Sequence, residues 1–272
     1  MYGAIIGDVV GSIYEFNNHK SKDFEFFDPR CFFTDDTAMS LAIARAVLDV
    51  KNEGKSMRDQ SILWMQRFGM RYQLLSYGTM FLKWLFTDAP KPYNSYGNGS
   101  AMRVSACGWA GDSLEEVEKL AEDSAAVSHN HEEGILGAVV TAKAIYMART
   151  GASMWDIRHM ADERYMLNGT IDKIRQTYRF DETCFGTVPV ALEAFLESTS
   201  FEDAIRNAIS VGGDSDTLAA ITGSVAEAYY GVPKWMKEKV RTYLDDYLLS
   251  ALDEFEAKYP SRENTRDEDG SN

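Results

Sequence analysis

Apolar side chains recur along most of the chain at intervals of three and four residues, the spacing that places them on one face of an α-helix. The strict alternation of apolar and polar residues that is typical of strands is scarce. The pattern predicts helices over residues 2–16, 35–52, 56–70, 76–87, 100–111, 114–126, 131–150, 153–163, 187–198, 201–210, 215–230, 233–240 and 240–257. We therefore expect an all-α protein.

No linker or internal repeat divides the chain, so these helices are expected to form one compact domain over residues 1–260. The 272 residues, of which 45% are hydrophobic, are sufficient for a large core. The final segment, SRENTRDEDGSN at residues 261–272, is polar and poor in hydrophobic side chains. Such a composition predicts a disordered tail.

Three glycines in the first predicted helix need an explanation, because each costs about 1 kcal/mol relative to alanine within a helix. Gly3, Gly7 and Gly11 are four residues apart and line one helix face, where they would allow close approach of another backbone. Asp8 and Glu15 lie seven residues apart on a neighbouring face. From the residues alone Glu15 is a solvated surface residue, unless this helix is central.

Two short acidic segments, TDDT at 34–37 and DSDT at 214–217, each begin an apolar helical run. One carboxylate at a helix N-terminus is ordinary capping. Two carboxylates and two hydroxyls within four residues repel one another unless a cation joins them. Oxygen ligands without His or Cys favour Mg²⁺, Mn²⁺ or Ca²⁺ over Zn²⁺. Because about 180 residues separate the segments, a shared metal site and two independent caps both stay open.

Two further segments carry candidate binding groups. In YNSYGNGSAMRVS at 93–105 a glycine-rich turn precedes Ser100, which is a good N-cap, and the backbone N–H groups of such a turn can hold an anion. In SHNHEEG at 128–134 the two histidines are two residues apart, which does not place them side by side for a metal. His129 is suited to a hydrogen bond with a ligand, whereas His131 is expected to be structural or exposed.

The charge balance excludes some partners. With 42 acidic and 28 basic side chains the net charge is −14, which argues against generic nucleic-acid binding. An anionic ligand would need cations and backbone N–H groups to hold it. No apolar run is long enough for a membrane span. The three cysteines lack metal-ligand spacing, which favours reduced thiols and a cytoplasmic location.

Taken together and in chain order, five segments resemble the motifs of the ADP-ribosylglycohydrolase family: GDVVGSIYE (7–15), FTDDT (33–37), GNGSAMR (97–103), SH (128–129) and GGDSDT (212–217). The resemblance spans roughly residues 1–232. That family includes the bacterial dinitrogenase reductase-activating glycohydrolase and eukaryotic ADP-ribosyl-acceptor hydrolases. Both acidic motifs are intact, which argues against a non-catalytic relative.

The resemblance implies an all-helical fold with two Mg²⁺ ions, or Mn²⁺ in their place, at the bottom of a cleft. It assigns as metal ligands Thr34, Asp35, Asp36, Asp214, Asp216 and Thr217, with Asp216 suited to bridge the ions. It makes Glu15 a candidate for metal binding or catalysis. The phosphate and ribose cradle would be formed by Gly97, Asn98, Gly99, Ser100 and Met102, with His129 contacting the ADP-ribose and Tyr96 stacking on or flanking it.

The implied reaction is hydrolysis of the bond between C1″ of ADP-ribose and an acceptor on a protein or small molecule. Asp36 or Glu15 would act as the base, and the sequence does not choose between them. The pattern favours arginine as the acceptor, with serine or another acceptor as the alternatives, and a monomeric protein. Two other functions stay open. A two-metal phosphohydrolase would use similar ions, although Arg103 is the one basic residue close to the motifs. A non-catalytic ADP-ribose-binding protein would bind without turnover.

Overall fold

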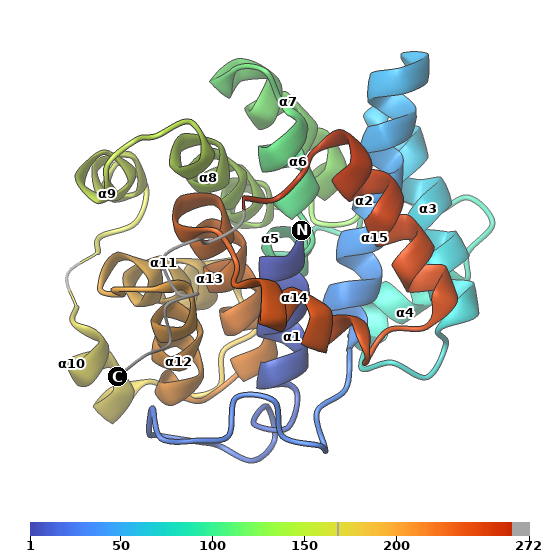
Figure 1. Cartoon of the computed structure of the whole chain (residues 1–272). Helices are drawn as coiled ribbons and strands as arrows, with labels where there is room; N and C mark the ends of the chain where they lie inside the picture. Colours follow the sequence, from blue (N-terminus) through green and yellow to red (C-terminus); the bar gives the residue numbers. More distant parts are fainter. Residues whose placement is uncertain (168, 263–272) are drawn as a thin grey trace.

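The computed structural model describes residues 1–167 and 169–262, and within these residues the elements of regular secondary structure are helices, as predicted (Figure 1). The helices are α1 (Tyr2–Gly11), α2 (Asp35–Glu53), α3 (Met57–Arg71), α4 (Thr79–Leu85), α5 (Gly99–Met102), α6 (Ser105–Ala110), α7 (Leu114–Ala126), α8 (Glu132–Arg149), α9 (Met154–Asp162), α10 (Ile171–Thr177), α11 (Cys184–Leu196), α12 (Phe201–Val211), α13 (Ser215–Tyr230), α14 (Lys234–Arg241) and α15 (Asp246–Lys258). Of the predicted disordered tail, residues 263–272 lie outside the described residues.

The predicted helices match these elements with few exceptions. The predicted helix 2–16 ends at Gly11, where the Ser12 hydroxyl donates to the carbonyl of Val9 at 2.8 Å and the chain turns. The predicted helix 100–111 is divided into α5 and α6 around Arg103. Helix α10 was not predicted, because it has only seven residues and buries one of them, Ile171. Such a short, mostly exposed helix leaves little apolar periodicity in the sequence.

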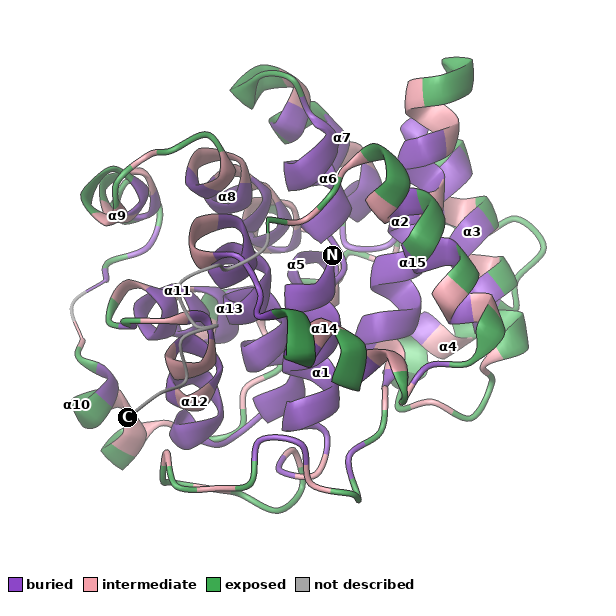
Figure 2. Ribbon diagram, viewed as in Figure 1, coloured by how far each residue is buried: buried purple, intermediate pink, exposed green. Residues whose placement is uncertain are grey.

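Helix α1 lies at the centre of the molecule, and all ten of its residues are buried (Figure 2). It packs against α13 along its glycine face. A Cβ atom on Gly3 would lie 2.1 Å from the carbonyl oxygen of Gly223, and one on Gly7 would lie 2.1 Å from that of Ala219. The two backbones are therefore in direct contact, and any side chain at these positions would separate the helices. The glycine spacing predicted this close approach.

The start of α1 is held by an acid from the far end of α13. The buried carboxylate of Glu227 accepts hydrogen bonds from the backbone N–H groups of Tyr2 at 3.1 Å and Gly3 at 2.8 Å. These are helix N-terminal N–H groups that lack a partner within their own helix. The two helices are thus fixed in register at this end by hydrogen bonds and along their length by glycine contacts.

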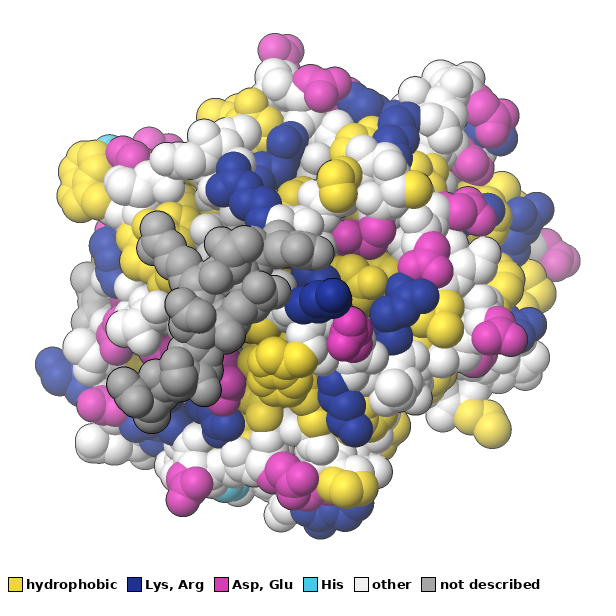
Figure 3. Space-filling model, in the orientation of Figure 1, with side chains coloured by type: hydrophobic (Ala, Val, Ile, Leu, Met, Phe, Trp, Pro, Cys, Tyr) yellow, Lys and Arg dark blue, Asp and Glu magenta, His cyan; other side chains and the backbone are white. Residues whose placement is uncertain are grey.

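The surface and the cysteines bear on the remaining predictions. No helix among the described residues has the length and apolar character that crossing a membrane requires. Cys31, Cys107 and Cys184 are all buried and free. On the face drawn in Figure 3, acidic and basic side chains are interspersed.

Candidate metal centre and active site

Three segments that are far apart in the sequence meet at one end of the α1–α13 pair. They are the C-terminal part of α1 with the turn after it, the N-terminus of α2 and the N-terminus of α13. The glycine contact continues to this end, because a Cβ atom on Gly11 would lie 2.5 Å from the Cα atom of Asp216. The hydroxyl of Thr217 donates to Oδ2 of Asp36 at 3.3 Å. This hydrogen bond joins the two acidic segments.

Asp8 fixes the N-terminus of α2 against α1. Its fully buried carboxylate accepts hydrogen bonds from the backbone N–H of Thr34 at 2.9 Å and of Thr37 at 3.0 Å. It also accepts from both threonine hydroxyls, the one of Thr34 at 2.7 Å. The Thr34 hydroxyl in turn caps the helix by accepting from the N–H of Asp36 at 3.2 Å. Asp8 was not among the predicted site residues, although its position on α1 had been noted.

The carboxylates form two adjoining groups in which oxygen atoms lie within 4.8 Å of one another: Asp8, Asp36 and Asp216 in one, and Glu15, Asp214 and Asp216 in the other. Asp216 belongs to both groups. In addition, Oδ1 of Asp36 is buried and has no hydrogen-bond partner among the described residues. Hard divalent cations bind carboxylate oxygens and would satisfy this atom. The donor set therefore fits a divalent-cation centre, in which Asp216 could contribute to both groups.

The pKa values of the carboxyl groups in the metal-free cluster also favour a cation site. Burial, together with the negative charges of Asp214 and Asp36, raises the pKa of Asp216 well above its usual value. Burial and the charge of Asp8 raise the pKa of Asp35 to about 7. Burial and the charge of Asp214 raise the pKa of Glu15 to about 8. Buried carboxylates without a cation are stabilised by taking up protons, so a cation that enters the cluster has protons to displace.

The glycine-rich turn before α5 holds the second acidic segment. The side-chain amide of Asn98 donates to Oδ2 of Asp214 at 2.7 Å and to the hydroxyl of Thr187 at 3.1 Å. The backbone N–H of Asn98 donates to the carbonyl of Glu182 at 2.8 Å. Asn98 thus connects the turn, α11 and the N-terminus of α13. Gly97 and Gly99 of this turn also lie close to His129. A Cβ atom on Gly99 would lie 3.2 Å from Nε2 of His129.

Arg103 is a buried cation without a carboxylate partner among the described residues. Its Nη2 donates to the carbonyl of Ser124 at 3.1 Å and to the Ser128 hydroxyl at 3.0 Å, and its Nε has no partner there. Burial lowers its pKa to about 10, so the guanidinium stays charged at neutral pH. A buried unpaired charge is costly. An anionic group in the adjoining cavity would offset that cost.

The tautomer of His129 follows from its neighbours. The Ser128 hydroxyl accepts from Arg103, and it lies 2.8 Å from Nδ1 of His129. Within the described residues this Nδ1 is the one acceptor for the hydroxyl proton, and a buried proton without an acceptor costs about 1–3 kcal/mol. The proton of the neutral ring is therefore on Nε2, which faces the glycine-rich turn. Burial and the charge of Arg103 lower the pKa of His129 well below its usual value, so the ring is neutral.

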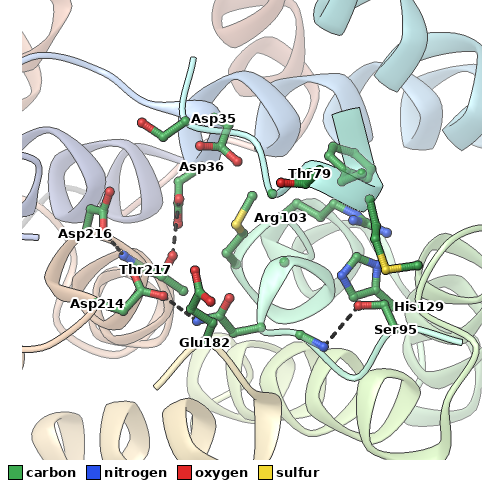
Figure 4. Close-up of a pocket in the computed structure, with 18 of the residues that line it drawn as sticks. Asp35, Asp36, Thr79, Ser95, Arg103, His129, Glu182, Asp214, Asp216 and Thr217 are labelled. Carbon is green, nitrogen blue, oxygen red and sulfur yellow. Dashed lines mark hydrogen bonds between the residues drawn. The ribbon is translucent and has the colours of Figure 1, made fainter. Parts of the chain in front are cut away.

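These groups line one cavity of about 320 Å³. Figure 4 shows that its two ends differ in charge. Asp35 and Asp36 from α2 and Asp214 and Asp216 from α13 lie toward one end, whereas Arg103, His129 and Ser95 lie at the other. The cavity can therefore hold a molecule that binds a cation-loaded cluster at one end and presents an anionic group at the other.

The remaining predicted residues lie at differing distances from this cavity. Gly97, Gly99 and Met102 line it. Ser100 is fully buried and its hydroxyl donates to the carbonyl of Gly134 at 2.6 Å, and Asn98, not Ser100, is the N-cap of α5. Tyr96 is 53% exposed, is not among the lining residues, and packs its ring against that of His131.

His131 is structural, as expected, because it caps α8 by accepting from the N–H of Glu133 at 3.1 Å. Glu182 lines the cavity and was not predicted. It lies in a segment without a motif, and it reaches the site because Gly97 and Thr183 form a β-bridge.

The model of the family described as ADP-ribosylglycohydrolase matches residues 1–264. The chain belongs to the ADP-ribosylglycohydrolase family. The resemblance stated from the motifs is therefore confirmed, and so is the all-α fold class. The prediction of an ADP-ribosylglycohydrolase enzyme is confirmed as well, because the relatives named for an activity are hydrolases of ADP-ribose linkages.

Two relatives and one solved structure illustrate the similarity. ADP-ribosylhydrolase ARH3 of Homo sapiens is 28% identical, over 91% of this chain and 90% of that protein. The ADP-ribosyl-[dinitrogen reductase] glycohydrolase of Rhodospirillum rubrum is 26% identical, over 73% of this chain and 69% of that protein. A solved structure titled ADP-ribosylglycohydrolase-related protein complex superposes with a TM-score of 0.67 at 23% identity, covering 94% of this chain and 92% of the other. This last likeness supports the fold.

Proposed function

We propose that the protein hydrolyses the glycosidic bond between C1″ of ADP-ribose and an acceptor, in a reaction that depends on two Mg²⁺ ions or on Mn²⁺ in their place. The family supports the chemistry. The observation that carries the metal dependence is the meeting of the two acidic segments, where Asp216 is common to both carboxylate groups. Lone N-caps would have no reason to adjoin, and the Thr217–Asp36 hydrogen bond joins segments 181 residues apart.

The metal ligands that we propose are Asp8, Asp36, Asp214 and Asp216 of the two carboxylate groups, together with Asp35, Thr34 and Thr217 of the predicted set. Glu15, the fifth carboxylate of these groups, is assigned to proton transfer. When bound, the ions would supply Lewis-acid chemistry, orienting the ribose hydroxyls and lowering the pKa of water. Thr34 has a second function in the metal-free protein, because its hydroxyl already donates to Asp8 and caps α2.

We place the pyrophosphate at the opposite end of the cavity. The buried guanidinium of Arg103 and the Nε2–H of His129 both favour an anion there. Within the turn, the N–H groups of Gly97 and Asn98 already donate to Ser95 and Glu182, which leaves those of Gly99 and Ser100 for an anion. This placement explains how a chain with a net charge of −14 would hold an anionic substrate. It also sets the direction of the substrate, with C1″ at the carboxylate end.

Glu15 is the better candidate for moving the proton. Hydrolysis adds a hydroxyl from water to C1″ and transfers a proton to the departing acceptor. Both oxygens of Asp36 face other duties, since Oδ2 accepts from Thr217 and Oδ1 is the orphan atom of the metal group. Glu15 is partly exposed, lies at the edge of the cluster and lines the cavity.

The family does not determine which side chain carries the ADP-ribose. The preference for arginine rested on likeness to the bacterial type, yet the match to ARH3 covers 91% of the chain and the match to the dinitrogen reductase glycohydrolase covers 73%. We therefore propose arginine and serine linkages as equal candidates. The monomeric state and the cytoplasmic location stay predictions.

A product assay tests the proposal. The purified protein is stripped with EDTA, supplied with Mg²⁺ or Mn²⁺, and incubated with ADP-ribosylated arginine and serine. We expect release of free ADP-ribose that is lost on chelation and restored by the ion. Asp36→Ala and Asp216→Ala should abolish turnover while the helical circular dichroism is retained, and the exposed Asp88→Ala should have no effect.

The alternatives give other results. Release of AMP would identify a phosphohydrolase, and tight binding of ADP-ribose without turnover of any linkage would identify a non-catalytic relative. Full activity after rigorous chelation would refute the metal dependence.

A further inference from the structure

A second cavity, of about 650 Å³, adjoins the first. Glu15 is the one described residue that lines both. Apart from Gly213, which belongs to the GGDSDT segment, the other lining residues come from two segments outside the family motifs, residues 16–20 after α1 and residues 176–180 at the end of α10. The acid that we assign to proton transfer thus lies at the boundary between the two cavities.

The walls of the second cavity are built onto the turn that precedes the metal ligands of α13. Gly212 and Gly213 both have positive φ, 72° and 78°. Asn18 accepts from the N–H of Gly213 at 3.0 Å, and the amine of Lys20 donates to the carbonyls of Tyr178, at 2.9 Å, and Val211. The cavity is therefore held in a fixed position relative to the carboxylate cluster.

The charge of the second cavity is opposite to that of the protein as a whole. Lys20 and Arg179 are its two cations, and Glu15 is its one acid. Both basic residues are exposed, and Arg179 makes no ion pair with any residue that the structure describes. Burial and the charges of Arg179 and Arg175 lower the pKa of Lys20, which indicates that the cations lie near one another. A local positive field on a chain of net charge −14 favours an anionic ligand.

Two aromatic rings add an apolar surface beside these cations. Phe16 is 81% exposed and Phe180 is 45% exposed, and the two rings stack on one another with centroids 6.2 Å apart. Exposed aromatic side chains next to a charged cavity are common where a peptide docks, because they bury a large apolar area. The stacked pair offers its outer faces to a ligand and leaves no slot between the rings for a base.

We propose that the second cavity binds the acceptor side of the substrate and that it selects a peptide carrying acidic residues next to the modified side chain. This inference rests on the proposed function, because it assumes that C1″ lies at the carboxylate end of the first cavity. The acceptor is attached to C1″ beside Glu15 and extends from there into the second cavity. Its acidic neighbours meet Arg179 and Lys20, and its apolar groups pack on Phe16 and Phe180.

A short acidic peptide is favoured over a long polyanion. Two cations are sufficient to pair with one or two carboxylates, whereas a nucleic acid or a poly-ADP-ribose chain would also cross the surrounding surface of an acidic protein. The volume of about 650 Å³ would hold a few peptide residues. A polymeric substrate is an outcome that the test below distinguishes.

The test uses matched ADP-ribosylated peptides that differ only in their flanking residues, which are acidic, neutral or basic. Each set is made with arginine-linked and with serine-linked ADP-ribose. We measure kcat/KM for release of ADP-ribose by the full-length protein with Mg²⁺. We expect the wild type to prefer acidic over basic flanks about tenfold, with a preference that falls as salt is raised. Arg179→Glu should abolish or invert the ratio of acidic to basic kcat/KM.

Arg164→Glu is the matched control, because Arg164 is also exposed and lies outside both cavities. It should leave the preference unchanged. Release of ADP-ribose at equal rates from all three peptides, with no salt dependence, would overturn the inference and leave the proposed function intact. Faster release from poly-ADP-ribose than from any peptide, dependent on Arg179, would assign the cavity to a polyanion and overturn the peptide assignment. Failure to release ADP-ribose from any peptide or from a single ADP-ribosylated amino acid would instead refute the proposed function.

Discussion

The substitution Asp216→Asn should stabilise the metal-free protein and abolish its stabilisation by Mg²⁺. Asp216 is buried, and its side chain belongs to both carboxylate groups. Asparagine keeps the oxygen that accepts from the N–H of Thr217 at 3.0 Å, so the local hydrogen bond can be retained. What the substitution removes is an ionisable group, and its effect on folding therefore depends on whether a cation is present.

The magnitude follows from proton linkage. Burial and the charge of Asp214 raise the pKa of Asp216 well above the 3.8 of an unperturbed aspartate. At pH values between 3.8 and this raised pKa, the folded metal-free protein binds a proton that the unfolded chain does not. Each pH unit above the unfolded pKa costs about 1.4 kcal/mol, which gives an upper limit of about 4 kcal/mol at pH 7. Asparagine has no such cost. Allowing for a poorer amide fit, we expect a gain in stability that stays below this limit and is measured as a rise in Tm.

Saturating Mg²⁺ should stabilise the wild type more than the Asp216→Asn variant. Ligand at 100 times its Kd stabilises a protein by about 2.7 kcal/mol, and the wild type should gain this amount. The variant lacks the ligand that the two carboxylate groups share and should gain little. Thermal unfolding is measured in EDTA and in Mg²⁺ for the wild type, Asp216→Asn and Asp88→Asn, an exposed control that should match the wild type. A variant less stable than the wild type in EDTA, or equal Mg²⁺ shifts in both proteins, would refute the reasoning.

Three further predictions concern other parts of the molecule. Because the pKa values of the clustered carboxyl groups are raised on folding, the metal-free wild type should lose stability as pH rises from about 5 to 8, and Mg²⁺ should reduce that slope; a Tm that rises with pH in EDTA would contradict this. Gly7→Ala would place a Cβ atom 2.1 Å from the carbonyl of Ala219 and should cost about 3 kcal/mol or more in urea unfolding, whereas Gly78→Ala, with nothing within 4 Å, should be nearly neutral. Ser128→Ala should change the tautomer of His129 seen by ¹H–¹⁵N NMR and raise the KM for substrate, while Ser128→Thr should restore both; an unchanged tautomer would show that the hydroxyl does not set it.

Local signals were sufficient to predict most of the helices. The run 114–126 begins after Ser113, whose hydroxyl accepts from the N–H of Glu116, and the run 215–230 stops at Gly231, whose φ of 77° no other residue type readily adopts. Both features lie within a few residues of the helix end that they determine. For that reason the order and bounds of the helices could be predicted without knowing how they pack.

The composition of the site could be predicted only in part, because its geometry depends on packing. Spacing alone could not decide whether the acidic segments meet, since their contact depends on the partner of the glycine face of α1. The glycine spacing in the first helix predicts that another backbone approaches it closely, but it does not identify that backbone as α13. Arg103 illustrates the same limit: nothing in its neighbouring residues indicates that its guanidinium is buried without a carboxylate partner.

The arrangement of the helices explains how an acidic cluster can form before a cation binds. The N-termini of α2 and α13 both face the cluster, and each dipole favours a nearby carboxylate by about 0.3–1 kcal/mol at exposed sites. Keeping one buried carboxyl group protonated at pH 7 costs up to about 4 kcal/mol, so the dipoles do not offset the cost. The stability must come from the core, above all from the α1–α13 contact through Gly3, Gly7 and Gly11. The glycines thus hold the carboxyl groups together in spite of this cost, and a cation that bound there would displace the protons that burial favours on them.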